Sequence, residues 1–201
     1  MILVKEILDV TIFVAGVFDR LGIAYLVGGS LASSLHGIPR ATQDADVVAA
    51  IQPGDVRDLV AALQETFYLD EDTIRRAVRE RSSFNIVHLE TLLKVDVFVA
   101  RQDNVSEQQM QRRQTFTIDP EARRELVVAS PEDVVAQKLY WYRLGDEVSE
   151  RQWSDAVGVL KVRSGRLDMD YLRRTARLLG VGDLLARACQ MAGLPGPEDG
   201  P

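Results

Sequence analysis

Three aspartates stand in segments that are otherwise built to be buried. Asp44 and Asp46 open the segment DADVVAAI, and Asp96 interrupts the apolar segment LLKVDVFVA. Side chains two residues apart on a strand point to the same face, so Asp44 and Asp46 would lie together. Neighbouring carboxylates repel each other, and a charge inside an apolar strand is costly unless it is paired. A divalent cation is the simplest compensation, because Mg²⁺ prefers carboxylate oxygens.

Each of these features also has a plainer interpretation. The Asp-x-Asp pair could be a polar strand entry in solvent, and Asp96 could form a salt bridge on an exposed face. The joint pattern is more specific, because three carboxylates on two neighbouring strands match two-metal phosphoryl or nucleotidyl transfer. In such sites two cations lie about 3.5–4 Å apart and hold the attacking and leaving oxygens.

A glycine turn precedes the first aspartates. In the segment YLVGGSLASSLHG, Gly28 and Gly29 end a buried strand and Ser30 opens a helix. Glycine lets the backbone approach a ligand closely, and a helix start offers free N–H groups and a positive dipole end. This is a natural phosphate site, although a tight turn with a serine helix cap would look the same.

Hydrophobic patterning predicts the elements that must position these residues. A first helix runs from about Val4 to Leu21 and ends at Gly22. The later expected elements, in chain order, are a strand in IAYLVGG, a helix in SLASSLHG, a strand in DADVVAAI, a helix from Pro53, a short charged helix in DEDTIRRAVRERSS, adjacent strands in SFNIVHL and LLKVDVFVA, a polar helix from about Ser106 to Arg113, and a strand in ELVVA.

The pattern changes at Ser130. SPEDVVAQKLYWYRLG has a capping serine, proline at the first helical position and a carboxylate in the first turn. From there to Gly193 the sequence predicts helices. We therefore predict an α+β protein with an α/β core over residues 1–129, a C-terminal helical region over 130–195 and a disordered tail over 196–201.

Composition narrows the functional classes. The 201 residues carry a formal net charge of −6, which disfavours bulk duplex DNA as a partner, because such binding is driven by Lys and Arg. The apolar N-terminus is interrupted by Lys5, Glu6 and Asp9, so no membrane segment is expected. The single cysteine, Cys189, excludes an internal disulfide and fits a cytoplasmic protein, where it would be a small core residue.

The segment GGSLASSLHGIPRATQDADVV resembles the signature of the polymerase-β-like nucleotidyltransferase superfamily. The detail HGIPRATQDADV, with Arg40 and Thr42 before the aspartates, is similar to the minimal branch that includes the AbiEii-type toxins. SPEDVVAQKLYWYRLGDEVSERQWSDAVGVL resembles the helical region of that branch. The resemblance implies a mixed β-sheet flanked by helices, followed by a C-terminal helical region.

The resemblance also implies a role for each residue. Asp44 and Asp46 would ligate two Mg²⁺ (or Mn²⁺) ions, and Asp96 would ligate the catalytic ion and help to deprotonate the acceptor hydroxyl. Gly28, Gly29 and Ser30 would hold the triphosphate of an NTP such as ATP. The hydroxyl would attack the α-phosphate in line, and pyrophosphate would leave.

Two basic residues complete the expected nucleotide site. Lys138, at the family's lysine position, would reach the triphosphate or would be an ordinary solvated lysine. Arg40 would contact phosphate or pair with a nearby aspartate. Arg151 and Asp155 stand one helical turn apart and are expected to form an ion pair.

The other distinctive side chains are expected to be structural. The aromatic residues 140–142 lie in one predicted helix, which favours a core position over base stacking. A solvated helix face is expected for the arginine group Arg75, Arg76, Arg79 and Arg81. His36 is expected to be a helix-end residue.

The sequence therefore predicts a metal-dependent nucleotidyltransferase that moves a nucleoside monophosphate from an NTP to an acceptor. RNA (a tRNA end above all), a protein or a small molecule such as an antibiotic could be the acceptor. A toxin role would bring an antitoxin partner. The alternative is a non-catalytic nucleotide-binding, antitoxin or scaffold module on the same fold, although such modules usually lose a carboxylate and here all three are present.

Overall fold

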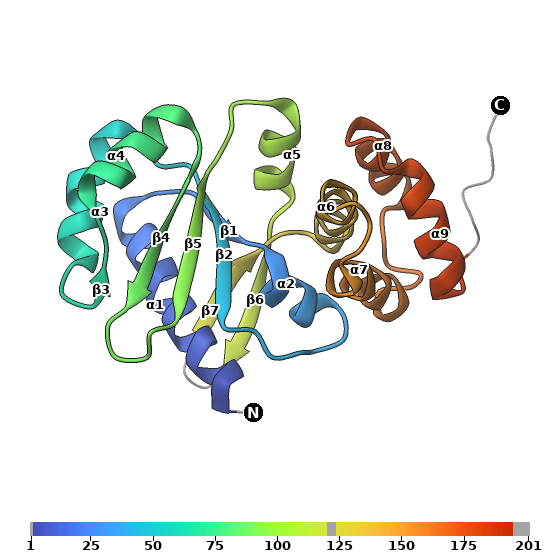
Figure 1. Cartoon of the computed structure of the whole chain (residues 1–201), viewed down its shortest axis with the longest axis horizontal. Coiled ribbons are helices and arrows are strands. Elements are labelled where there is room, and N and C mark those ends of the chain that lie inside the picture. Colours follow the sequence, from blue (N-terminus) through green and yellow to red (C-terminus); the bar gives the residue numbers. More distant parts are fainter. Residues whose placement is uncertain (1, 120–123, 195–201) are drawn as a thin grey trace. The chain divides into compact units, whose positions relative to one another are not determined.

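The computed structural model describes residues 2–119 and 124–194 (Figure 1). The elements in chain order are α1 (Ile2–Leu21), β1 (Tyr25–Val27), α2 (Gly29–His36), β2 (Asp44–Ala49), a 3₁₀ turn (Pro53–Asp55), α3 (Val56–Leu63), β3 (Phe67–Tyr68), α4 (Glu71–Glu80), β4 (Ser83–His88), β5 (Lys94–Val99), α5 (Asn104–Arg112), β6 (Gln114–Asp119), β7 (Arg124–Val128), α6 (Pro131–Leu144), α7 (Glu150–Val162), α8 (Met169–Leu178) and α9 (Gly182–Ala192).

The strands form one mixed sheet in the order β3-β4-β5-β2-β1-β7-β6. β2 and β5 run parallel at its centre, whereas β1 pairs with β2 and β4 pairs with β5 in the antiparallel sense. The two carboxylate-bearing segments are therefore neighbouring strands, as the sequence predicts. The mixed sheet with flanking helices, followed by α6 to α9, confirms the expected architecture.

Alternation along the central strands decides which side chains enter the core. Ala45, Val47 and Ala49 of β2 are at most 1% exposed, and the alternate residues of β5 are buried as well. Helices α1, α3 and α4 cover this side of the sheet (Figure 1). The register thus buries one face of β2 and β5 and leaves their aspartates on the other, half-buried face.

The start of α6 follows the expected capping pattern. The Ser130 hydroxyl accepts a hydrogen bond from the backbone N–H of Asp133, and Pro131 occupies the first turn. This arrangement satisfies one of the N–H groups that a helix start leaves unpaired. Helices α6 to α9 then pack on one another, and Cys189 of α9 is fully buried among them, as predicted.

Two compact units account for the chain. The first contains Met1–Leu31 and Ala41–Ala129, and the second contains Ala32–Arg40 and Ser130–Pro201. The unit boundary falls inside α2, whose first residues belong to the first unit and whose remainder belongs to the second. The division into domains at residues 129 and 130 stays a prediction, and the tail over 196–201 lies outside the described residues.

Two strands were not predicted from the sequence. β3 has only two residues, too few to show a period. β6 is an edge strand that pairs with β7 alone and is largely exposed, so its Thr-Phe-Thr-Ile alternation carries little burial signal. None of the helices in residues 2–119 and 124–194 has both the length and the apolar character to cross a bilayer.

Candidate active site

The three predicted carboxylates share one face of two paired strands. Asp46 of β2 lies opposite Asp96 of β5, and Asp44 lies opposite Lys94. Adjacent strands are about 4.8 Å apart, and residues in register point to the same side of the sheet. Each of the four side chains is half-buried. The sheet therefore gathers three carboxylates and one ammonium group on a surface that solvent can reach.

Asp44 is held by a neighbour on its own segment. The hydroxyl of the buried Thr42 lies 2.8 Å from Oδ1 of Asp44 and 3.1 Å from its backbone oxygen. A hydroxyl donor at this distance restricts the rotation of the carboxylate. Thr42 is thus a positioning residue, which the sequence indicated only through the resemblance.

Asp96 has a cationic partner, Lys94. The Lys94 Nζ atom lies 2.8 Å from Oδ2 of Asp96. This hydrogen bond raises the pKa of Lys94; partial burial acts in the opposite direction, and the charges of Asp96, Asp44 and Asp46 add to the rise. The salt bridge that the sequence left open as the plainer interpretation of Asp96 is therefore present.

The carboxylates on this face suit a metal ion that binds together with a phosphate group. Within the described ranges, no three His, Cys, Asp or Glu side chains are arranged to hold a metal ion by themselves. Mg²⁺ in nucleotide sites takes only one or two carboxylates and completes its octahedron with phosphate oxygens and water. Asp46 and Asp96, side by side in register, fit that requirement. Convergence of all three aspartates on two ions stays a prediction.

The glycine turn lies directly against Asp46. The Gly28 N–H donates to the backbone oxygen of Asp46 over 2.8 Å. Gly29, the first residue of α2, has a φ of +55°, and a Cβ atom there would lie 1.7 Å from Oδ2 of Asp46. Only glycine leaves room for that carboxylate. The turn, the first turn of α2 with Ser30, and the Asp46 side chain therefore meet at one place.

Replacing Gly29 by alanine is expected to displace the Asp46 carboxylate and abolish nucleotide-dependent behaviour. The left-handed φ alone costs about 1–2 kcal/mol for a residue with a side chain. Gly22→Ala is the matched control, because Gly22 has a φ of +67° and a Cβ atom there would meet no described atom within 4 Å. Melting temperatures with and without Mg²⁺ and ATP should show destabilisation in both variants, larger in Gly29→Ala because of the added clash with Asp46, and a nucleotide response lost only in Gly29→Ala. A retained response in Gly29→Ala would show that Asp46 does not need its present position.

The predicted basic residues Arg40 and Lys138 meet at a buried carboxylate of the second unit, Asp155. Arg40 donates through Nε to Oδ1 over 2.8 Å and through Nη2 to Oδ2 over 3.0 Å. Lys138 Nζ lies 2.8 Å from Oδ2, and the Ser33 hydroxyl donates to Oδ2 over 3.1 Å. Burial raises the pKa of Asp155, but the hydrogen bonds from Arg40 and Lys138 outweigh it and hold the pKa below its usual range.

This cluster corrects one sequence prediction and refines another. The expected Arg151–Asp155 pair is wrong: across the described residues Asp155 is bonded by Arg40 and Lys138, while Arg151 is exposed. Lys138 is 4% exposed, so it is not a solvated lysine. Two cations share one carboxylate, which leaves a net positive charge of the kind that phosphate recognition uses. Their contact with a nucleotide stays a prediction.

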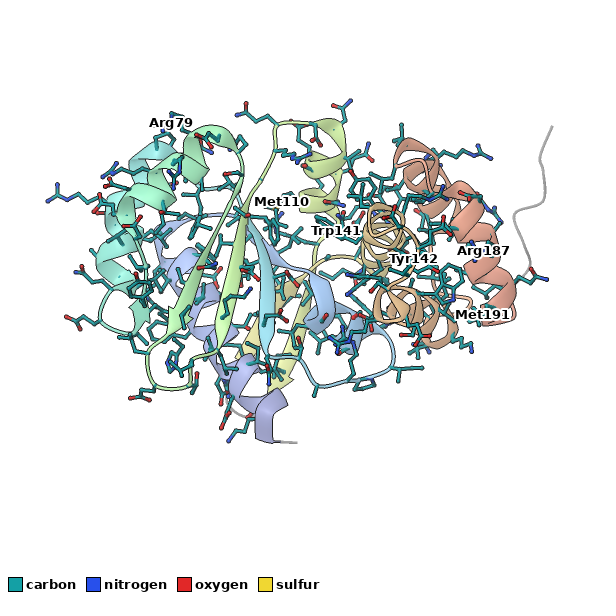
Figure 2. The ribbon with its side chains drawn as sticks, in the orientation of Figure 1. Arg79, Met110, Trp141, Tyr142, Arg187 and Met191 are labelled. Carbon is teal, nitrogen blue, oxygen red and sulfur yellow. The ribbon has the colours of Figure 1, made fainter. Side chains whose placement is uncertain are left out.

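The aromatic residues, the arginine group and His36 differ in their environments. Trp141 is 47% exposed and is not a core residue, whereas the Tyr142 ring packs 5.2 Å from that of Trp153. Figure 2 shows Tyr142 on α6, with Arg187 and Met191 on α9; both α9 residues contact Trp153. Arg79 on α4 is exposed, as are its neighbours Arg75 and Arg76, which fits a solvated face (Figure 2). His36 ends α2, as predicted, and is buried.

Comparisons with known proteins find likeness in structure but not in sequence. No family model matches the chain, and no curated protein does. An antigenic nucleotidyltransferase-like protein from Paracoccidioides brasiliensis is 16% identical, with a TM-score of 0.56 over 92% of this chain and 93% of that chain. The antibiotic-resistance factor ANT(2'')-Ia in solution is 13% identical, with a TM-score of 0.56 over 93% and 98%.

A crystal structure of ANT(2'')-Ia in complex with adenylyl-2''-tobramycin gives a similar result. It is 14% identical, with a TM-score of 0.54 over 86% of this chain and 96% of that chain. At these identities the likeness concerns the fold. It confirms the predicted nucleotidyltransferase-type fold, which spans nearly the whole length of each of the three structures.

Proposed function

We propose that this chain is a metal-dependent nucleotidyltransferase that moves a nucleoside monophosphate from an NTP to an acceptor hydroxyl. The observation that carries the proposal is the register of Asp46 with Asp96, with the Asp46 carboxylate against the Gly29 backbone at the start of α2. An enzyme of this class needs carboxylates beside a phosphate-holding turn, because its chemistry is mostly positioning and charge neutralisation. The nucleotidyltransferase-type fold is consistent with it.

The residues divide the work in the proposed reaction. Asp44, Asp46 and Asp96 would hold one or two Mg²⁺ or Mn²⁺ ions, which supply positive charge beside the triphosphate. The N–H groups of the turn from Gly28 to Ser30 would bind the β- and γ-phosphates. Asp96 would accept the proton of the acceptor hydroxyl as its oxygen bonds to the α-phosphorus. The bond from that phosphorus to pyrophosphate breaks in the same displacement.

Net charge and one structurally similar protein bear on the class of acceptor. The net charge of −6 disfavours a long nucleic acid, because phosphate repulsion would oppose its approach. One structurally similar protein holds an adenylylated small molecule, adenylyl-2''-tobramycin. We therefore place a small-molecule hydroxyl first, ahead of an RNA 3′ end or a protein hydroxyl. A toxin role, as in the AbiEii-type branch, would appear as growth arrest on expression that Asp46→Asn relieves.

The transfer itself is tested with labelled nucleotides. The protein is incubated with Mg²⁺ and each of the four NTPs, labelled at the α- or the γ-phosphate, together with total RNA, cell protein or a panel of aminoglycosides. The proposal expects α-label, and no γ-label, in one acceptor fraction, because pyrophosphate leaves with the γ-phosphate. γ-Label in the acceptor would identify a phosphotransferase instead.

The same samples decide between an enzyme and a non-catalytic nucleotide-binding module. Mg²⁺ with ATP is expected to raise the melting temperature, because a ligand that binds only the folded state stabilises it. A raised melting temperature without transfer of label to any acceptor would favour the binding module. Absence of both effects in folded protein would contradict the proposed function.

A further inference from the structure

Among the described strand residues, Lys94 is the only cation on the carboxylate face of β1, β2, β4 and β5. The side chains of this face are Leu26 on β1, Asp44, Asp46 and Val48 on β2, Lys94, Asp96 and Phe98 on β5, and Ser83, Asn85 and Val87 on β4. Three negative charges thus face one positive charge. The strand register itself places Lys94 opposite Asp44 and two residues from Asp96.

The ion pair is reachable from solvent. The Lys94 side chain is 43% exposed and that of Asp96 is 23% exposed. Lys94 and Asp44 also line an open pocket of about 430 Å³ with Glu6, Gln43 and the 91–93 turn. A long, flexible lysine at such a site can leave its partner without breaking the core. Small ions can approach Asp44 through this pocket, and the partial exposure of Asp96 leaves its carboxylate accessible as well.

We propose that Lys94 is the resident counter-ion of this carboxylate cluster, and that it must leave Asp96 before a divalent cation can bind there. The inference rests on the proposed function. Its basis is the 2.8 Å contact between Lys94 Nζ and Oδ2 of Asp96. The ammonium group takes up negative charge on Oδ2 that a metal ion at about 2.1 Å would otherwise use, and the two cations repel each other at that distance.

Lys94 would therefore couple the cation to the nucleotide. Without nucleotide, the ammonium group competes with a divalent ion for Asp96, so the ion alone binds weakly. With nucleotide, the phosphate oxygens give both cations new partners, and Lys94 can move to them. The enzyme would then take up its metal together with its NTP, and a bare metal ion would rarely occupy the site.

The test is the affinity for Mn²⁺ alone, measured from the electron paramagnetic resonance signal of the free ion. Lys94→Met is expected to bind Mn²⁺ without nucleotide about threefold to tenfold more tightly than the wild type, since a partly exposed pair competes modestly. Lys94→Arg keeps the charge and should behave as the wild type. Lys161→Met removes an exposed lysine of α7 and is the matched control.

The outcomes separate this inference from the proposed function. The inference is overturned if Lys94→Met binds Mn²⁺ no more tightly than the wild type. It is also overturned if Lys94→Arg gains as much Mn²⁺ affinity as Lys94→Met. If Asp46→Asn weakens Mn²⁺ binding in that same experiment, the proposed function still stands. If no variant binds Mn²⁺ and Mn²⁺ with ATP raises no melting temperature, both fail. The melting temperature gives a readout independent of activity. Without metal, Lys94→Met should melt at a lower temperature than the wild type, because its carboxylates repel one another unscreened, and Mn²⁺ should restore the melting temperature.

Discussion

Asp46→Asn is expected to reduce nucleotidyl transfer by about 10³-fold or more, which corresponds to roughly 4 kcal/mol of lost transition-state stabilisation. Asparagine has nearly the same shape but no charge, so it cannot balance a cation beside the triphosphate. Asp46 also lies against the Gly29 backbone, so its carboxylate is placed directly beside the turn. The measurement is the initial rate of α-label transfer with saturating Mg²⁺ and NTP.

Folding must be shown to survive this substitution. Asp46 lies on the half-buried face of β2 and outside the core, so the melting temperature without nucleotide should change little. Asp146→Asn serves as the control, because Asp146 is exposed in a turn with a φ of 55° that asparagine tolerates. Full activity in a folded Asp46→Asn protein would remove Asp46 from the mechanism.

Asp155→Asn is expected to have the largest effect on stability, lowering the free energy of unfolding by about 3–5 kcal/mol. The substitution leaves the charges of Arg40 and Lys138 without their shared carboxylate, and the Lys138 side chain is only 6% exposed. Burying an uncompensated ammonium group is costly. Urea denaturation monitored by circular dichroism measures the change.

An exposed ion pair in the same unit provides the comparison. Asp183 lies 2.6 Å from Arg143, but its side chain is 64% exposed. Asp183→Asn should therefore cost about 1 kcal/mol or less. Equal effects of Asp183→Asn and Asp155→Asn would contradict the view that burial makes the Asp155 cluster important.

Acid is expected to remove the difference in the free energy of unfolding between the wild type and Asp155→Asn. The pKa of Asp155 is below its usual range in the folded protein, so its stabilisation is complete above the ordinary carboxyl value of about 4. It is lost as the pH falls through the lowered folded-state pKa. Urea midpoints between pH 7 and pH 3 should keep a constant gap down to about pH 4 and converge below it. A gap that closes near neutral pH would assign the effect to another group.

Local patterns in the sequence were enough to predict the elements around the site. The alternation in DADVVA and KVDVFV, together with the glycine turn, predicted neighbouring strands with their aspartates on one face, and the register of Asp46 with Asp96 confirms it. Ser130 and Pro131 predicted the start of α6 because helix capping depends on a few adjacent residues.

Contacts between distant residues were beyond local patterns. Arg40 and Asp155 are 115 positions apart, and helical spacing pointed to Arg151 as the partner of Asp155 instead. Alternation places Lys94 on the same face of its strand as Asp96, two residues away. It does not show whether the two side chains pair, because that depends on their rotamers and on the neighbouring strand.

The most direct test of the carboxylate site is anomalous scattering from Mn²⁺ in crystals grown with a non-hydrolysable NTP. We predict an anomalous peak for an ion that carboxylate oxygens of Asp46 and Asp96 and the triphosphate coordinate, with Lys94 turned away from Asp96. A nucleotide bound elsewhere, or Mn²⁺ bound with Asp96 still paired to Lys94, would contradict it.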